Sequence, residues 1–499
     1  MKLANIIKHL EAIDIKGNIK IEIKGLAYNS SSVKDNYVFV AIEGFQVDGH
    51  KYIKDAISNG AKAIVVSRDI EVSEDITVIK VKDTRVALSN LSAAFYRQPS
   101  KNLELIGVTG TNGKTTTIYF VKSVLEASKR NTSLIGTVET IINGKSFCSS
   151  HTTPESLALQ GMFNSMLLKK VDTCVMEVSS HSLQLSRVND CDFNIGIFTN
   201  LTHEHLDFHG SMENYYSSKK QLFYNTNDFN IVNIDDYYGS RLATELKSHK
   251  TRLLTYGINN DADINAKDIL FYKDCSEYTI NTPTQKVKFK TRIPGLYNIY
   301  NSLAAVACGF ALGIDLQQIK KGIEAVTSIP GRFQVIPTDK DLNIIVDYAH
   351  TPDGFENVLR TISEYAKGRI IIVFGCVGER DYTKRSKMGQ IAQRYCDLSI
   401  LTTDNCRSED PKSIVNEIKK GFNKGDKPYI EILDREEAIR YAIINSSKED
   451  TIIITGKGHE KRQIIGDKTI YFNEREIAKQ ALKELELTSL KNSKSLIHL

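Results

Sequence analysis

The sequence of 499 residues lacks the features that mark several classes of protein. It has no tryptophan, and its eight cysteines include no Cys-x-x-Cys pair, which argues against both a disulfide framework and a zinc ribbon. No apolar run approaches the ~20 residues that a membrane-spanning helix needs. The net charge of +5 is small and spread along the chain, so nothing indicates a nucleic-acid-binding surface. We therefore expect a cytoplasmic protein that binds neither membranes nor nucleic acid.

What is present is enough apolar sequence, 41% of residues, for several cores. Alternating strand and helix patterns predict an α/β fold in three domains. We expect a small N-terminal α/β domain at 1–98, a central doubly wound, P-loop ATPase-like domain at 99–330 and a C-terminal Rossmann-like domain at 331–488. The polar end, 489–499, is expected to fray.

Individual elements can be predicted from apolar runs between turn signals. The first 15 residues resemble a short amphipathic helix without a signal-peptide core. Strands are expected at 20–24, 37–42, 63–67, 77–81, 103–108, 173–176, 194–199, 230–234, 344–346, 369–374, 398–401, 430–433 and 451–455. Helices are expected at 85–96, 118–125 and 301–312.

One glycine-rich stretch stands between a predicted strand and a predicted helix. It reads Gly110-Thr111-Asn112-Gly113-Lys114-Thr115-Thr116. This layout directs backbone N–H groups and a helix N-terminus at a phosphate. Lys114 would reach the outer phosphates, and Thr115 would place a hydroxyl on Mg²⁺. The strict P-loop pattern requires glycine where Val108 stands, yet we still expect a nucleoside triphosphate here.

Two polar clusters follow predicted strands of the central domain. One contains Glu177, and the other contains His203, His205, Asp207 and His209. The histidine run resembles the ligand run of dinuclear metallo-β-lactamase-like hydrolases, with one residue inserted. The alternative is that Glu177 and one histidine hold Mg²⁺ beside the triphosphate, because Mg²⁺ prefers oxygen ligands and needs few from the protein.

Eight segments together carry a family resemblance. GVTGTNGKTTT, EVSSHSL, TNLTHEHLDFHG, YYSSKKQLF, GLYNIYNSLAA, PGRFQVI, DYAHTPD and FGCVGERD are similar, in order and spacing, to the signatures of the Mur ligase family. The resemblance covers nearly the whole chain. The family's phosphate loop has this form, which accounts for the misfit at Val108.

The resemblance implies an ATP- and Mg²⁺-dependent amide ligase of peptidoglycan precursor synthesis, acting as a monomer. ATP would phosphorylate the D-Glu γ-carboxylate of UDP-MurNAc-L-Ala-D-Glu, and an amine would attack the acyl phosphate. By resemblance, Thr115 and Glu177 hold one Mg²⁺, His205 serves a second, and Lys219 is carbamylated to give an anionic ligand. The implied adenine and ribose contacts are Asn301, Arg332 and Asp347.

The implied contacts of the UDP-sugar dipeptide lie in the first two domains. They are Tyr28, Ser30, Phe45, Gln46, Val47, His151, Thr152, Thr153, Ser179, Leu185 and Arg187. Arg187 could pair with a pyrophosphate or carboxylate as a planar fork. Two features depart from the family. Its usual Asp-Ser-Arg is Asn29-Ser30-Ser31 here, and Leu185 stands where glutamine is common, with Gln184 beside it.

The third substrate is expected in the last domain. Asp404-Asn405-Cys406-Arg407 resembles the Asp-Asn-Pro-Arg motif of ligases that add meso-diaminopimelate, whose second carboxylate an arginine can clamp. The other matching positions are Arg380, Gly456 and Glu460. L-Lysine, or another diamino acid in a specialised paralogue, stays open as an alternative. A folylpolyglutamate synthase would share the ligase core but has no use for a UDP-binding domain.

Overall fold

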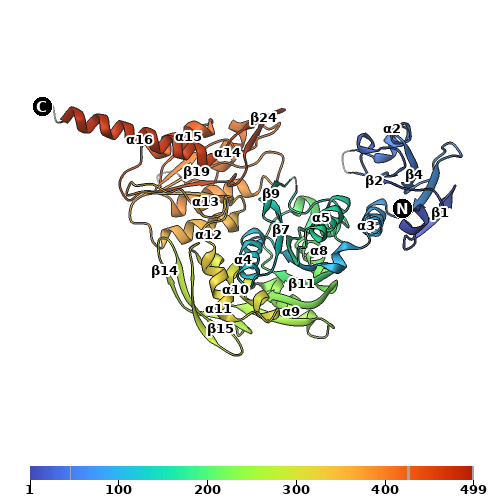
Figure 1. Ribbon diagram of the computed structural model, residues 1–499. Helices are drawn as coiled ribbons and strands as arrows, with labels where there is room; N and C mark the ends of the chain where they lie inside the picture. Colours follow the sequence, from blue (N-terminus) through green and yellow to red (C-terminus); the bar gives the residue numbers. More distant parts are fainter. Residues whose placement is uncertain (45–46, 150, 424–426, 497–499) are drawn as a thin grey trace.

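The fold is described from a computed structural model that covers residues 1–44, 47–149, 151–423 and 427–496, with side chains to Glu486. Figure 1 shows three α/β domains in a row, with the central one between the other two. The predicted α/β class is confirmed. The boundaries at 98 and 330 are retained as proposals.

The N-terminal domain has one five-stranded sheet in the order β1-β5-β4-β3-β2, parallel except for the edge strand β1. Its elements are α1 (Leu3–Ile6), β1 (Ala12–Lys16), β2 (Gly25–Ala27), β3 (Tyr37–Val40), α2 (Ile53–Ser58), β4 (Ala61–Val66), β5 (Thr77–Val81) and α3 (Thr84–Phe95). Two expectations were wrong. The predicted N-terminal helix stops at Ile6, and the run 20–24 forms only an isolated bridge at Glu22.

The central domain has an eleven-stranded sheet in the order β16-β15-β14-β13-β12-β11-β6-β10-β7-β8-β9. Its strands are β6 (Glu104–Thr109), β7 (Thr132–Ile135), β8 (Glu139–Ile142), β9 (Lys145–Cys148), β10 (Thr173–Glu177), β11 (Phe193–Phe198), β12 (Thr226–Asn233), β13 (Arg252–Gly257), β14 (Ile264–Phe271), β15 (Ser276–Asn281) and β16 (Lys286–Thr291). Its helices are α4 (Lys114–Ala127), α5 (Ser156–Leu168), α6 (Ser180–Gln184), α7 (Leu206–His209), α8 (Met212–Tyr224), α9 (Tyr237–Leu246), α10 (Leu296–Ala311) and α11 (Leu316–Ala325).

Strand β6 lies between β10 and β11, both parallel to it. The chain therefore leaves β6 at a point where the strand order diverges to both sides. Open α/β sheets bind ligands at such switch points, outside the carboxyl ends of the strands. The predicted doubly wound arrangement thus places the glycine-rich loop at the position where this fold binds ligands.

The C-terminal domain has a six-stranded sheet in the order β17-β18-β22-β19-β20-β21, followed by a two-stranded hairpin. Its elements are β17 (Gln334–Val335), β18 (Asn343–Asp347), α12 (Pro352–Ser363), β19 (Ile370–Phe374), α13 (Lys384–Tyr395), β20 (Leu398–Leu401), α14 (Pro411–Lys419), β21 (Tyr429–Glu431), α15 (Arg435–Ile444), β22 (Thr451–Thr455), β23 (Arg462–Ile465), β24 (Lys468–Tyr471) and α16 (Glu474–Leu496). Helix α16 extends to Leu496, and the expected fraying from Ser489 stays a prediction.

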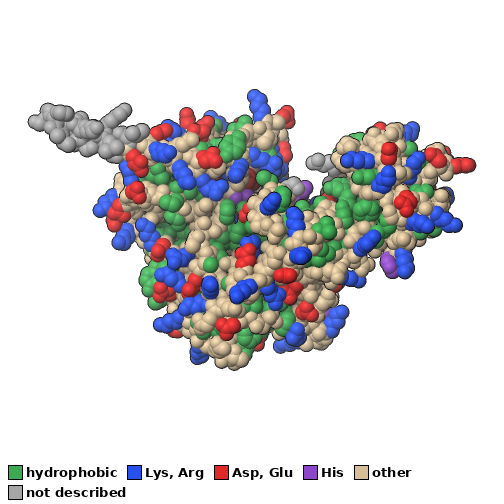
Figure 2. Space-filling view, in the orientation of Figure 1, with side chains coloured by type: hydrophobic (Ala, Val, Ile, Leu, Met, Phe, Trp, Pro, Cys, Tyr) green, Lys and Arg blue, Asp and Glu red, His purple; other side chains and the backbone are tan. Residues whose placement is uncertain are grey.

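One apolar cluster joins the central and C-terminal domains. Ile299 of α10 and Phe355 and Val358 of α12 belong to it together with apolar residues of β6 and α4, among them Ile106 and Val121. The N-terminal domain has its own cores and packs through α3 against α5. Figure 2 shows the resulting open notch between the two outer domains, and both charge signs mixed over the visible face. Among the described residues, no helix is long and apolar enough to cross a bilayer.

Helices α4 and α11 pack so closely that Gly322 has no room for a side chain. A Cβ there would lie 2.5 Å from Val124 Cα and 2.8 Å from Val124 N, both backbone atoms of α4. A backbone inside a core cannot yield as a flexible side chain can. The position therefore fixes how α4, which carries Lys114 at its start, lies against its neighbour.

Gly322→Ala should lower the melting temperature although alanine is the better helix former. The gain in helix propensity is ~1 kcal/mol, whereas overpacking costs ~1–3 kcal/mol and more against backbone. Thermal unfolding followed by circular dichroism measures the change, with the exposed Lys321→Ala on the same helix as control. An unchanged melting temperature would show that α4 and α11 can move apart freely.

Candidate active site

The glycine-rich loop connects β6 to α4 as predicted, and Lys114 is the first residue of the helix. Gly113 has a φ of +86°, and a Cβ there would lie 2.3 Å from Asn301 Oδ1, so glycine permits both the turn and the approach of α10. Lys114 Nζ donates to the carbonyls of Gly110 and Thr111, each at 2.8 Å. Burial lowers the pKa of Lys114. The ammonium is held at the helix N-terminus, where an anion would bind.

The two predicted oxygen ligands of Mg²⁺ lie side by side. Thr115 Oγ1 donates to Glu177 Oε1 at 2.9 Å, although 62 residues separate them. Neighbouring ligands on an ideal Mg²⁺ octahedron with bonds of 2.0–2.1 Å also lie about 2.9 Å apart. The pair therefore fits one edge of the coordination sphere of Mg²⁺. Thr137, which the sequence did not single out, donates to Glu177 through its N–H at 2.8 Å and its hydroxyl at 3.0 Å.

Lys219 points at the same loop from helix α8. Its side chain is 1% exposed, and Nζ donates to the Gly110 carbonyl at 2.7 Å, the same oxygen that Lys114 contacts. The aromatic ring of Tyr215 lies 4.7 Å from Nζ. Burial and then the charge of Lys114 hold the pKa of Lys219 well below its usual value. The lowered pKa makes the neutral amine easier to form than it is for a solvated helix lysine.

His205 stands beside these groups in a left-handed backbone conformation, with φ 56°. Its ring packs edge-on to His181, with centroids 4.8 Å apart. Burial lowers the pKa of His205 to about 4, so the imidazole is neutral near pH 7 and able to bind a metal. The dinuclear hydrolase alternative gains no support. His209 Nε2 lies 2.9 Å from Ser180 Oγ, and in the described part of the chain no three His, Cys, Asp or Glu side chains group as metal ligands.

A cavity of about 300 Å³ opens next to the loop, between the central and C-terminal domains. Asn301, Arg332 and Asp347, the predicted adenine and ribose contacts, all line it. Arg332 reaches back into the central domain, where its NH2 donates to Thr115 Oγ1 at 3.0 Å. Asp347 accepts the backbone N–H groups of Phe333 and Ala349, each at 2.6 Å. The cavity is thus continuous with the proposed Mg²⁺ edge.

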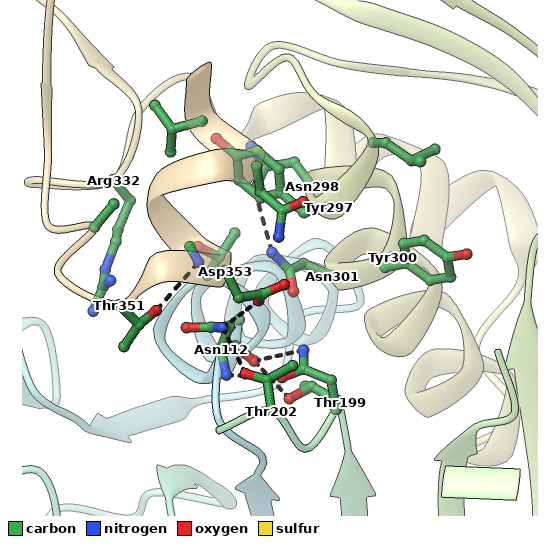
Figure 3. A pocket seen from close by; sticks show the side chains of 18 of the residues that line it. Asn112, Thr199, Thr202, Tyr297, Asn298, Tyr300, Asn301, Arg332, Thr351 and Asp353 are labelled. Atoms are coloured by element: carbon green, nitrogen blue, oxygen red, sulfur yellow. Dashed lines mark hydrogen bonds between the residues drawn. The ribbon is translucent and has the colours of Figure 1, made fainter. Parts of the chain in front are cut away.

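Both domains contribute side chains to the wall of this cavity (Figure 3). Asn112 of the loop donates to Asp353 of α12 at 2.7 Å, and Thr351 caps α12 by accepting the Gly354 N–H at 3.2 Å. Near by, His350 Nε2 lies 3.2 Å from Glu204 Oε1. A nucleotide bound here would contact two domains at once.

The residues predicted for the UDP-sugar dipeptide form a second group. Thr153 Oγ1 donates to the Glu177 carbonyl at 2.9 Å, and Arg187 NH1 donates to the Thr153 carbonyl at 3.1 Å. Thr152 Oγ1 lies 3.0 Å from Thr137 Oγ1, which links this group directly to the proposed Mg²⁺ ligands. Arg187 Nε lies 2.7 Å from Glu155, a carboxylate that an anionic ligand would have to displace.

The remaining members of that group are distributed over both domains. Burial and then the charge of Glu155 raise the pKa of Tyr28. This first-domain residue therefore lies within electrostatic range of Glu155 and Arg187 in the central domain. Ser30 begins the 3-10 turn Ser30–Ser32, Val47 and His151 are exposed, Ser179 caps α6, and Leu185 ends it. Phe45 and Gln46 lie outside the described residues.

The predicted amino-acid residues gather at the carboxyl ends of β20 and β22. Asn405 Nδ2 donates to Glu460 Oε2 at 3.1 Å. Arg407 has a φ of 54°, and its NH1 lies 3.9 Å from Glu379, an acidic neighbour that the sequence did not indicate. Cys406 is buried, and its N–H donates to the Asp404 carbonyl at 3.1 Å, a bond that proline could not make. Gly456, with φ +114°, adjoins Asp404, whereas Arg380 is exposed and no described contact fixes it.

Comparison with known proteins agrees with this geometry. The models of the Mur ligase family catalytic domain, the Mur ligase middle domain and the Mur ligase glutamate ligase domain match residues 22–96, 108–309 and 331–458. These matches define the chain as an ATP-dependent, amide-forming ligase. The chain belongs to the Mur ligase family, which confirms the resemblance drawn from the motifs.

Several relatives carry the name UDP-N-acetylmuramoyl-L-alanyl-D-glutamate–2,6-diaminopimelate ligase. The protein from Caldanaerobacter subterraneus subsp. tengcongensis is 45% identical over 97% of this chain and 100% of its own. That from Clostridioides difficile is 44% identical over 97% and 100%. A solved structure with the same name superimposes with a TM-score of 0.69 at 28% identity, covering 97% of this chain and 99% of the other.

Lys114→Met should abolish turnover while leaving the fold intact. The methionine keeps the aliphatic stem, but the charge that faces the phosphates is lost, and every ~1.4 kcal/mol of lost transition-state stabilisation costs tenfold in rate. ADP release in the presence of all substrates measures this, and Lys122→Met, on the same helix and paired with Glu126, serves as control. Retention of more than about a tenth of the activity would contradict a phosphate-binding role for Lys114.

Proposed function

We propose that this Mur ligase joins meso-diaminopimelate to the γ-carboxylate of D-Glu in UDP-MurNAc-L-Ala-D-Glu. The observation that carries the proposal is the convergence of Lys114, Lys219 and the Thr115–Glu177 pair on one loop, next to a cavity shared by two domains. Relatives that bear the name of this ligase match the chain along its full length. The resemblance of the Asp404–Arg407 loop to the diaminopimelate motif supports the choice of amino acid.

The chemistry has two steps that balance. A γ-carboxylate oxygen of the dipeptide attacks the terminal phosphorus of ATP, and ADP leaves. The amine of the third residue then attacks the acyl carbon, loses a proton, and inorganic phosphate departs as the new amide forms. Phosphoryl transfer between anions depends mostly on positioning and charge neutralisation. Lys114 supplies positive charge for the outer phosphates, and Mg²⁺, held by Thr115 and Glu177, would supply the rest.

Lys219 is proposed to act as a carbamate. Its buried, low-pKa amine can attack the carbon of CO₂ and lose a proton, which replaces a cation by an anionic oxygen donor. The exchange also removes the repulsion between Lys219 and Lys114, whose Nζ atoms share the Gly110 carbonyl. The carbamate and the neutral imidazole of His205 would then serve a second Mg²⁺ near the acyl phosphate.

The nucleotide-sugar is proposed to lie along the group that contains Tyr28, Thr152, Thr153 and Arg187. The hydroxyl of Thr137 contacts both Thr152 and Glu177 and so connects that group to the proposed Mg²⁺ edge. A dipeptide carboxylate placed there would reach the phosphate. Glu155 forms an ion pair with Arg187, and the ligand would replace the Glu155 carboxylate in that pair.

Selection of the third residue is proposed to depend on Arg407. Among the described residues its guanidinium has only a distant carboxylate partner, Glu379, and it is partly exposed. The distal carboxylate of meso-diaminopimelate could therefore replace that contact with a bidentate one. L-Lysine lacks this carboxylate. Glu460, with its carboxylate near Asn405, would bind the distal ammonium.

An ADP-release assay with a panel of amino acids tests the function. With UDP-MurNAc-L-Ala-D-Glu present, meso-diaminopimelate should be used in strong preference to L-lysine, because a site built for a carboxylate discriminates well against a ligand without one. Arg407→Ala should lose diaminopimelate activity chiefly through KM and gain little with lysine. Arg394→Ala, a 64% exposed arginine of the same domain, is the control. Equal use of L-lysine by the wild type would refute the choice of substrate.

Lys219→Ala should be nearly inactive and partly rescued by short carboxylic acids, which return an anionic oxygen to the site. The neighbouring Lys220→Ala should stay active, because Lys220 is a third exposed and pairs with Glu245 at 3.3 Å. The assay is ADP release with and without acetate or formate. Full activity of Lys219→Ala without any added acid would exclude the carbamate role.

A further inference from the structure

Lys457 is a buried cation that the proposed mechanism does not use. Its side chain is 0% exposed, just beyond the end of β22. Nζ donates to Asn405 Oδ1 and to Glu460 Oε2, each at 2.9 Å, and lies 3.8 Å from Asp404 Oδ1. Its partners are therefore residues of the amino-acid site, including Asn405, 52 positions away in the sequence.

These bonds fix the orientation of Asn405. Its Oδ1 accepts from Lys457 and also from the Ile464 N–H at 2.9 Å, so the amide nitrogen must face the other way. That nitrogen donates to Glu460 Oε2 at 3.1 Å. Glu460 Oε2 therefore receives two donors, and no described residue donates to Oε1. One carboxylate oxygen is anchored and the other is left for a ligand.

A second buried ion pair supports the same loop from below. Arg435 Nε donates to Glu474 Oε1 at 2.9 Å, and Glu474 Oε2 accepts the Gly458 N–H at 3.0 Å. Arg435 also donates to the carbonyls of Thr403 and Thr455, at the ends of the two strands that carry the site. The loop 456–460 is thus held at its base, and Lys457 connects this base to Glu460.

Exposure decreases sharply from Glu460 inward. The side chain of Glu460 is 26% exposed, whereas those of Lys457, Asp404, Arg435 and Glu474 are 0–2% exposed. The cluster contains two cations and three carboxylates. Of these three carboxylates only Glu460 is exposed enough to meet a ligand from solvent. A buried ion pair of this kind costs desolvation, and fixing a geometry is one reason for it to exist.

We propose that Lys457 is a positioning residue that holds Glu460 and Asn405 so that Glu460 Oε1 faces the ammonium of the incoming diamino acid. Lys457 itself does not touch the substrate. The inference rests on the proposed function, because it assumes that this pocket binds a diamino acid. An exposed carboxylate alone would sample several orientations, and the buried Lys457 holds Glu460 in one of them before the ligand binds.

Lys457→Met tests the proposal in the full-length enzyme. The KM for meso-diaminopimelate should rise roughly tenfold or more, because two charge-assisted hydrogen bonds to the binding groups are lost. The KM values for ATP and for UDP-MurNAc-L-Ala-D-Glu should stay within about twofold, since neither site contacts Lys457. Lys448→Met, a 77% exposed lysine of the same domain, is the control.

A double-mutant cycle separates positioning from a purely structural role. If Lys457 acts through Glu460, Lys457→Met/Glu460→Gln should have the same KM for meso-diaminopimelate as Glu460→Gln alone, within about twofold. The double variant also removes the negative charge of Glu460 that Lys457 compensates. It therefore keeps the test available if Lys457→Met alone does not fold. An unchanged KM in folded Lys457→Met, or a further rise of about fivefold in the double variant over Glu460→Gln, would overturn the proposal. Failure of the wild type to use any diamino acid would instead refute the proposed function.

Discussion

The site depends on one backbone oxygen, the carbonyl of Gly110, which accepts from the ammonium groups of both Lys114 and Lys219. Two lysines on one acceptor repel each other, and desolvation disfavours their charged forms. Anions relieve that situation. A triphosphate would compensate Lys114, and a carbamate would convert Lys219 into an anion. Helix α8 places Lys219 against the loop, and the site therefore favours the binding of negatively charged groups.

The central domain does not complete this site by itself. Arg332 reaches Thr115 from the C-terminal domain, Asp353 accepts from Asn112, and His350 lies against Glu204. Burial alone would raise the pKa of Glu204, but His350 and the surrounding cations hold it below its usual range. These contacts sit above the apolar cluster that the two domains share. The proposed nucleotide site is therefore complete only when the central and C-terminal domains pack together.

The proposed amino-acid pocket is organised differently, by paired charges of opposite sign. Arg407 has Glu379 as a loose partner, and Glu460 has Lys457 as a close one. A loose pair can exchange its partner for a ligand carboxylate, whereas a close pair holds its carboxylate in place. A ligand with an ammonium and a carboxylate at one end would meet both kinds of pair. This arrangement suits meso-diaminopimelate better than a ligand of one charge sign.

Local patterns in the sequence were sufficient for much of the fold. The strands at 77–81, 398–401 and 451–455 were predicted to the residue, because each is a short apolar run between turn signals. The helix predicted for the first 15 residues was wrong. The spacing of Leu3, Ile6 and Ile7 suits a helix, but Ala12–Lys16 forms a strand because it pairs with β5, more than 60 residues later. Ile13 is 63% exposed there, so burial left no signal in the pattern.

The sequence by itself determined the phosphate loop and the family, because loop chemistry is carried by neighbouring residues whose backbone and side chains act together. Gly113, Lys114 and Thr115 can be recognised in order for that reason. Only the tertiary structure decided which distant groups these residues meet. The contacts of Thr137 with Glu177, of Glu379 with Arg407 and of Lys457 with Asn405 join residues 28–52 positions apart. Hydrogen bonds and ion pairs act over a few ångströms in space, and folding alone brings such residues that close.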